Sequence, residues 1–472
     1  MIRFSSLTVI CVLFVGCLAA PDFSPPEIAA DIPPGWTGAQ ASGAVTGDWI
    51  REFNDPKLDS IVQTAIAQNP SLEIAAARLA QAQAGTRMAT SALLPQVNFN
   101  QTASRQQNVF TTGSFPIQNE GAGSAPDPIR TTNNSFGIQV DMSWEIDLWG
   151  RIRAGRAAAL AEQQAARDEL AAARLSLAAQ TAKAWFAVCE ASELVGVARE
   201  TVASFERSTR VVRDRFEGGI ANALDLRLAL TNQENADALL QQRLQQLDAA
   251  TRQLEIIMGD YPAAKLKPGD LPSVRGNVPA GIPAAILARR PDLQAAERQV
   301  AAARKREVEA RLALLPRIAL TAAGGSTTDA LKNILSNDFG VWTIAANLTQ
   351  PLFDGGRLIA EKDRQTAVKE EVEAAYVRDA LEAFREVETA LAAERRLRNR
   401  VAADREAAKQ AGKALDLALE QYSAGLRDYL FVLEAQRTYF NARSRVLNTR
   451  RERLDNRINL HLALGGDFTT QL

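Results

Sequence analysis

The side chains that most often carry enzyme chemistry are scarce in this sequence. The 472 residues include one histidine, His461, and three cysteines, Cys11, Cys17 and Cys189. A histidine–cysteine metal cluster or a histidine-dependent catalytic triad needs more of these groups. The chain also carries no phosphate-binding glycine loop and no nucleophile elbow, and acid pairs on charged helices are usually solvated. The sequence therefore predicts no enzyme, no cofactor and no metal site.

Cys17 ends a segment with the layout of a bacterial secretory signal. Arg3 supplies a positive charge, an apolar run follows over 7–15, and small residues come next. Because FVGC resembles a lipobox, we expect a signal peptide over 1–16 and a lipid, including palmitate, on Cys17. Residues 17–45 would then form an extended segment that is anchored in the membrane by its lipid. One acyl chain binds a membrane weakly, so a second anchor or several chains are needed.

An alternative reading of the N-terminus leaves the chain without lipid. Phe14 stands where a lipobox usually has leucine, and ordinary cleavage after Ala19 or Ala20 would give no anchor. Cys11 leaves with the signal in either case. Cys189, within WFAVC on an expected helix, is then a buried structural thiol.

Charge and hydropathy exclude two further classes. The formal net charge is -1, whereas proteins that bind nucleic acid need clustered positive surface. After the signal, no segment is apolar over the ~20 residues that a transmembrane helix requires. We expect neither a nucleic-acid partner nor a membrane-spanning helix.

The sequence contains an internal repeat. ALLPQVNFN (92–100) returns as ALLPRIALT (313–321), and GGIANALDLRLALTNQENA (218–236) matches AGLRDYLFVLEAQRTYFNA (424–442). Internal repeats of this kind indicate two copies of one structural plan. We expect repeat 1 over 46–258, a linker over 259–290, repeat 2 over 291–464 and a C-terminal tail over 465–472.

Short strands are expected near the start of each repeat. FGIQVDMSWE (136–145) alternates apolar with polar or small residues, which is typical of a strand with one apolar face. The polar stretch 101–134 is expected to be an exposed loop. The four strands are predicted at about 95–101, 135–145, 316–323 and 339–349.

Long helices follow the strands. Leucines at 240, 244, 247 and 254 alternate steps of four and three, which indicates coiled-coil packing. Gly219 and Gly425 fall where one helix must turn back into the next, and glycine tolerates the left-handed backbone of such turns. The long helices are predicted at about 154–216, 221–258, 358–422 and 426–464.

A secretory signal, alternating strands and no spanning helix together indicate the bacterial outer membrane. Four strands are too few to close a membrane barrel, whose smallest examples in one chain have about eight. Several chains must therefore share a barrel, with apolar side chains toward lipid and Gln139, Asp141 and Ser143 toward a wet lumen. A soluble β-hairpin whose apolar face packs on a coiled coil is the alternative.

Several segments carry a resemblance to a known family. They are GDWIREFNDPKLDSIVQTAIAQNP (47–70), WEIDLWGRIRAG (144–155), ARRPDLQAAERQV (288–300), QPLFDGGRL (350–358) and YSAGLRDYLFVLEAQRTYF (422–440). With them the chain resembles the TolC/OprM family of outer-membrane efflux channels, and within it the NodT-type lipoprotein subunits of RND tripartite pumps.

The resemblance implies a mostly α fold with a membrane β portion. Three chains would form a homotrimer with a shared twelve-stranded barrel, continued by an α-helical barrel in the periplasm. The region 46–60, the linker and the C-terminus would form an equatorial belt. The partners would be outer-membrane lipid, a periplasmic adaptor and an inner-membrane RND-type pump, and the channel would conduct small molecules passively to the outside.

The resemblance also implies a periplasmic gate at Tyr422, Leu430, Glu434 and Arg437. Leu430 and Glu434 are four residues apart, so they share one helix face. Repeated by threefold symmetry, they would form an apolar ring beside a ring of carboxylates, which resists wetting and attracts cations. The alternative is that Leu430 is heptad core and Glu434 a solvated partner of Arg437.

The helix tips are the second site that the resemblance implies. Gly219, Ile220, Gly425 and Leu426 match family positions at which adaptor hairpins meet the channel. The alternative is a pair of plain helix turns with an apolar staple. Two other functions also remain open for the whole chain: a duct of the same fold for protein (type I) secretion, and a structural coiled-coil lipoprotein that conducts nothing.

Overall fold

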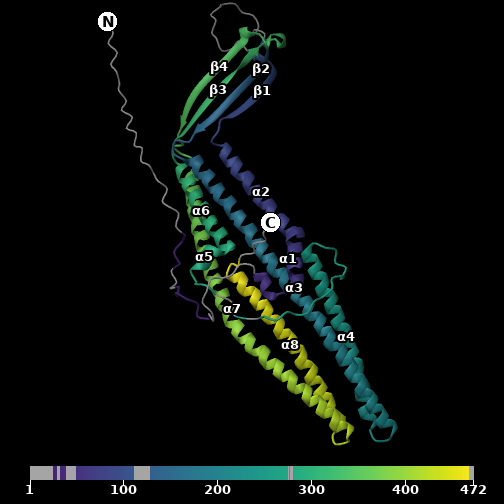
Figure 1. Cartoon of the computed structure of the whole chain (residues 1–472). Helices are drawn as coiled ribbons and strands as arrows, with labels where there is room; N and C mark the ends of the chain where they lie inside the picture. The colour runs from purple at the N-terminus through teal and green to yellow at the C-terminus, as the bar shows by residue number, and fades with distance from the viewer. Residues whose placement is uncertain are drawn as a thin grey trace, which may run out of the picture.

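The structure is a computed structural model that describes residues 25–28, 32–38, 49–110, 128–274, 276 and 280–466. The predicted signal peptide, Cys17 and most of the predicted C-terminal tail lie outside these residues. The molecule is long and narrow, with a small sheet at one end and two helical hairpins at the other (Figure 1). Among the described residues, no helix has the length and hydropathy needed to cross a membrane.

Helices make up most of the chain. The longest, α3 and α7, have 67 residues each and extend over roughly 100 Å at 1.5 Å per residue. The helices are η1 (Trp49–Phe53), α1 (Pro56–Gln68), α2 (Pro70–Ser91), α3 (Arg151–Glu217), α4 (Ala223–Met258), α5 (Ala285–Arg289), α6 (Pro291–Leu312), η3 (Leu331–Asn333), η4 (Asn337–Phe339), α7 (Arg357–Ser423) and α8 (Tyr429–Ala463).

The element order repeats as helix, two strands, long helix and shorter helix, which confirms the predicted fold class. The strands are β1 (Gln96–Phe110), β2 (Ile129–Ile146), β3 (Arg317–Thr328) and β4 (Gly340–Thr349). They form one antiparallel sheet in the order β1-β2-β3-β4. Both outer edges of the sheet, on β1 and on β4, lack a partner strand within the described chain.

The expected loop over 101–134 is wrong at both ends. β1 continues to Phe110 and β2 begins at Ile129, so 101–110 and 129–134 are paired strand. These outer parts carry polar residues on both faces, as in Arg105 opposite Asn134 on one face and Gln106 opposite Asn133 on the other, and therefore lack the apolar alternation that marks a strand. The residues between them, 111–127, lie outside the described part of the chain.

The register sorts the side chains onto two faces. Phe99, Val140, Gly324 and Trp342 stand opposite one another across all four strands and belong to the apolar face. On the other face, Asp141 accepts hydrogen bonds from the amides of Asn98 and Asn100 on β1. One side of the sheet is therefore apolar and exposed, and the other is polar and internally hydrogen-bonded.

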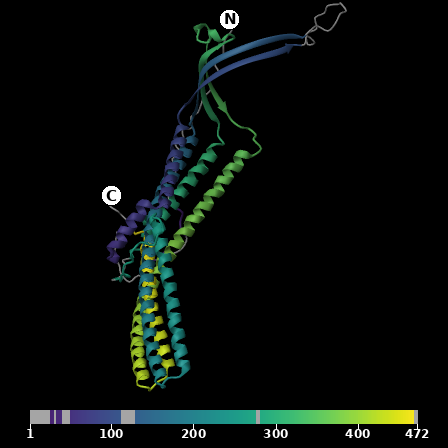
Figure 2. The same ribbon diagram turned by 90° about the vertical axis from the view of Figure 1, so that its right-hand side faces the viewer.

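The sheet curves away from the long axis of the molecule, most clearly at β1 and β2 (Figure 2). Gly325 lies on the polar face, where a Cβ atom would collide with the carbonyl oxygen of Ile138. A close approach between strands of this kind requires glycine and is typical of sharply curved sheets.

In both repeats, an aspartate side chain between the strand and the long helix accepts N–H groups at the start of that helix. The carboxylate of Asp147 accepts the backbone N–H groups of Ile152 and Arg153, at 3.0 and 2.8 Å. In the second repeat, Asp354 accepts the N–H groups of Gly356 and Leu358, each at 3.1 Å. An acidic side chain at a helix start satisfies donors that have no partner in the helix, and this fixes where α3 and α7 begin.

The main core lies at the waist of the molecule, where the two repeats meet. Side chains of η1, α1, α3, α4, the linker and α8 are buried together there, among them Trp49, Trp185, Leu254, Leu271 and Ile458. Cys189 belongs to this core, as expected for a structural thiol, and burial raises its pKa to about 12. Its sulfur therefore stays protonated and unreactive at neutral pH.

Candidate functional site at the helix tips

Each long helical hairpin ends in a tight turn around a glycine. Gly219 has φ of 74° and Gly425 has φ of 76°, so both use the left-handed backbone. The N–H of Ile220 donates to the carbonyl of Arg215 at 2.8 Å, and that of Gly219 to Phe216 at 3.0 Å. These paired bonds form a Schellman motif, which ends α3.

The second tip repeats this motif. The N–H of Leu426 donates to the carbonyl of Gln421 at 2.9 Å, and that of Gly425 to Tyr422 at 3.0 Å. Because both tips use the same bonds, the two hairpins present matching turns at one end of the molecule (Figure 1).

The apolar residue that follows each glycine is not packed. Ile220 is 70% exposed and Leu426 is 73% exposed. A Schellman motif usually covers this residue with an apolar partner three positions before the helix cap, yet those positions hold Arg215 and Gln421. The apolar staple of the plain-turn alternative is therefore absent at both described tips.

Three of the predicted gate residues share one exposed face of α8. Leu430 is 65% exposed, and Glu434 follows one helical turn later on the same face. Arg437, a further turn along, lies 3.7 Å from the Glu434 carboxylate in an exposed ion pair. An exposed leucine does not fit the heptad-core reading, whereas the exposed pair matches the solvated-partner reading of Glu434.

Tyr422 lies apart from these three residues. It is buried between the helices, with its ring 5.5 Å from that of Tyr429, in a core that also contains Phe205, Val212 and Val432. Burial raises the pKa of both tyrosines, so their phenols stay neutral. The structure thus places Tyr422 in the packing behind the exposed face, as a support for the turn.

Two arginines near the tips were not predicted. Arg215 on α3 stacks on the Tyr422 ring and donates to the Ser423 carbonyl at 3.0 Å, which joins the two hairpins. Arg427 stacks on Phe431, with 5.1 Å from its guanidinium carbon to the ring centre. A groove of about 430 Å³ between α7 and α8 is lined by Arg427, Phe431 and Glu434, among others.

The part of the chain that the structure describes shows no arrangement with the geometry of a metal site. Groups of three or more histidine, cysteine, aspartate or glutamate side chains with a geometry for a metal ion do not occur among these residues. What the structure shows near the tips is exposed apolar surface at Ile220 and Leu426 and an exposed ion pair at Glu434 and Arg437.

Comparison with known proteins identifies the family. The sequence profile of the family described as "Outer membrane efflux protein" matches residues 61–260 and 282–466. The chain is 30% identical to the probable efflux pump outer membrane protein TtgC of Pseudomonas putida, over 99% of this chain and 96% of that protein. It is 32% identical to the pyoverdine export outer membrane protein OpmQ of Pseudomonas aeruginosa, over 98% and 96%.

Solved structures agree with this result. The open state of the Neisseria gonorrhoeae MtrE outer membrane channel superimposes with a TM-score of 0.81 at 26% identity, covering 95% of this chain and 99% of that one. The Campylobacter jejuni CmeC outer membrane channel shares the fold, with a TM-score of 0.85 at 23% identity, over 96% and 95%. The chain therefore belongs to the outer membrane efflux protein family and is a bacterial outer-membrane exit duct for efflux.

Proposed function

We propose that three copies of this chain form one closed channel, with the sheets joined edge to edge in the outer membrane. The observation that carries this proposal is the open sheet: within the described residues its β1 and β4 edges have no partner strand, and one of its faces is apolar and exposed. Backbone groups at an open edge have no partner in lipid, so only a closed barrel is stable there. Because neighbouring strands alternate in direction, β4 of one copy can continue the antiparallel pattern with β1 of the next.

The same proposal assigns the two faces of the sheet. Val97, Phe99, Trp342 and Ile344 are exposed on the apolar face and would contact lipid. The opposite face, with Asp141 and its two asparagine partners, would line a wet lumen. This arrangement matches the alternation of lipid-facing and lumen-facing side chains in outer-membrane barrels.

The proposed gate is the exposed face of α8 at Leu430 and Glu434. In a trimer these residues would form an apolar ring next to three carboxylates at the narrow periplasmic end. Arg437 would balance part of this charge, and Tyr422 would hold the turn that carries the face. An apolar constriction opposes wetting, and a ring of acids favours cations once water enters.

A single-channel experiment tests both the pore and the gate. We expect the purified full-length chain to form detergent-resistant trimers that open pores in planar bilayers. Leu430→Ser and Glu434→Ala should raise the conductance of the closed state severalfold. Leu224→Ser is the matched control, because Leu224 occupies the equivalent repeat position and is also 65% exposed.

Unchanged leakage in both gate variants would overturn the gate assignment while leaving the pore intact. Trimers that open no pores at all would instead favour the structural coiled-coil lipoprotein. The two results separate the gate from the channel itself.

The proposed partners follow from the relatives and from the exposed tips. TtgC is named as part of an efflux pump, and OpmQ as an export protein for pyoverdine. By this likeness, the duct would receive small molecules from an RND-type inner-membrane pump through a periplasmic adaptor, with no enzyme activity of its own. Ile220 and Leu426 give the adaptor an apolar surface, and a lipid on Cys17 would add an anchor to the outer membrane.

A further inference from the structure

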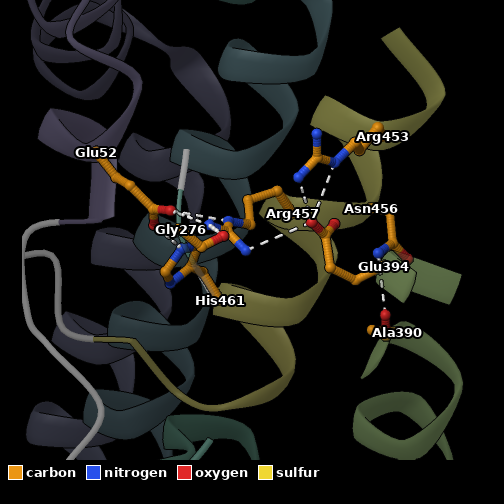
Figure 3. Close-up of polar contacts among 8 residues, drawn as sticks. All are labelled: Glu52, Gly276, Ala390, Glu394, Arg453, Asn456, Arg457 and His461. Carbon is orange, nitrogen blue, oxygen red and sulfur yellow. Dashed lines mark hydrogen bonds and ion pairs between the residues drawn. The ribbon is translucent and has the colours of Figure 1, made fainter. Parts of the chain in front are cut away.

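Arg457 on α8 joins three separate parts of the chain at the waist (Figure 3). Its side chain is 0% exposed, its Nε donates to Glu52 at 2.8 Å, and its Nη2 donates to the carbonyl of Gly276 at 3.0 Å. Glu394 on α7 lies 3.6 Å from Nη1. One buried cation therefore contacts η1, the linker and α7.

Glu52 is held from a second side by His461. The imidazole Nε2 lies 2.6 Å from the Glu52 carboxylate, and Trp49 stacks on the imidazole at 5.9 Å between ring centres. Although burial opposes ionisation, the hydrogen bond from His461 and the charge of Arg457 lower the pKa of Glu52. The carboxylate of η1 is thus a fixed negative partner for α8.

A second attachment lies on the N-terminal side of η1. Trp36 is buried against Phe384 on α7, and its Nε1 donates to the carbonyl of Ala280 in the linker at 2.9 Å. Beside it, Glu388 accepts three hydrogen bonds, from the N–H and Oγ1 of Thr37 at 2.8 and 2.7 Å and from the N–H of Gly38 at 3.1 Å. The buried Trp36 ring and the three hydrogen bonds to Glu388 therefore hold residues 36–38 against α7.

Both attachments also hold the linker. Trp36 donates to the carbonyl of Ala280. Arg457 donates both to the carbonyl of Gly276 and to the carboxylate of Glu52. The described linker residues between α4 and α5 form no helix or strand, so their backbone groups need partners from elsewhere. Glu255 on α4 and Glu193 on α3 accept N–H groups of the first part of the linker, at Ala264, Lys265, Leu266 and Leu271. The carbonyls of Gly276 and Ala280, closer to α5, are bound by α8 and by Trp36.

We propose that residues 32–38 and 49–53 form a waist clasp, which locks the linker onto α7 and α8. The clasp joins the two repeats at the waist, because the linker that it holds connects them. Trp36 with Glu388 is one fastening of the clasp, and Glu52 with Arg457 is the other.

Hydrogen exchange in the intact trimer tests the clasp. We expect Trp36→Ala to accelerate amide exchange about tenfold at 32–38 and equally at the linker amides of Gly281, Ile282 and Ala284, which follow the Ala280 carbonyl that Trp36 binds. Glu388→Gln should give a smaller acceleration in the same two places. Glu382→Gln is the matched control, because Glu382 lies on the same helix and forms an exposed ion pair with Arg385.

Faster exchange at 32–38 with unchanged linker exchange would overturn the clasp, because the fastening would then be released without effect on the linker. If Trp36→Ala fails to form trimers, Glu388→Gln decides the question, since it alters only hydrogen bonds at a half-buried carboxylate. The measurement is independent of conductance, so it stands or falls separately from the proposed gate.

Discussion

The guanidinium carbon of Arg215 lies 5.0 Å from the centre of the Tyr422 ring, which brings the end of α3 against the last turn of α7. The same side chain donates to the Ser423 carbonyl at 3.0 Å. A cation over an aromatic face contributes about 0.5–2 kcal/mol, depending on how far it is desolvated. Arg215 therefore stabilises the arrangement in which the two tips lie together.

Removal of this contact should loosen the tips. We expect Arg215→Ala to raise closed-state conductance in planar bilayers, because the last turn of α7 loses its stacking and hydrogen-bond contact with the end of α3. Arg213→Ala, an exposed arginine two residues earlier on α3, serves as the control and should leave conductance unchanged. Equal conductance in the two variants would show that Arg215 does not restrain the tips.

Charge at the tips should abolish efflux without unfolding the trimer. Ile220→Asp and Leu426→Asp place carboxylates on surfaces that are proposed to bind the adaptor through apolar contact. The accumulation of a pump substrate in cells measures the effect, and size-exclusion chromatography checks the trimer. Leu335→Asp, an exposed leucine between η3 and β4, should retain efflux; retained efflux in the tip variants would argue against docking there.

Asp455 on α8 should make stability depend on pH. Burial is the main cause that raises its pKa from 3.8 to about 6, and Glu452 adds to it, while Arg451 and Lys183 oppose it. Because the pKa is raised on folding, the stabilisation that this group gives is full below pH 3.8 and is lost as pH rises through about 6.

Asp455→Asn tests this dependence. The variant removes the cost of a buried charge, and its amide can keep the 2.8 Å contact with Arg451 through the side-chain oxygen. We expect a higher melting temperature than wild type at pH 7.5, and a difference that closes toward pH 4. The exposed Asp416→Asn is the control, and a gap that is constant with pH would contradict the assignment.

Lipidation should depend on Cys17 alone. In cells fed labelled palmitate, Cys17→Ala should yield an unlabelled mature chain, because no other mature cysteine lies next to a signal cleavage site. Cys189→Ala should stay labelled, since that thiol is buried. An unlabelled wild-type chain that begins after Ala19 or Ala20 would favour the alternative cleavage.

The sequence was most informative where one face of an element is apolar. The alternation over 136–145 predicted the inner half of β2. The outer halves of β1 and β2 were not predicted as strand, because their polar residues carry no such pattern. The Gly219 and Gly425 turns could be predicted because a left-handed backbone strongly favours one residue type.

Contacts between distant side chains left no trace in the sequence. His461 was noted only as a lone histidine, yet its partner Glu52 is 409 residues away. Arg215 and Ser423 are separated by 208 residues, and the arginine falls in a charged stretch that reads as solvated surface. Periodicity reports which face of an element is buried, and it does not report which residues of another element meet that face.

The open edges of the sheet have a consequence for inheritance. If each subunit of the trimer pairs its β1 and β4 with strands of its two neighbours, a subunit with a damaged edge strand prevents closure of a barrel that also contains normal subunits. In a cell that expresses both forms, random mixing would leave few trimers without a damaged member. A lesion in these strands would therefore behave as a dominant trait, whereas a subunit too unstable to assemble would be recessive.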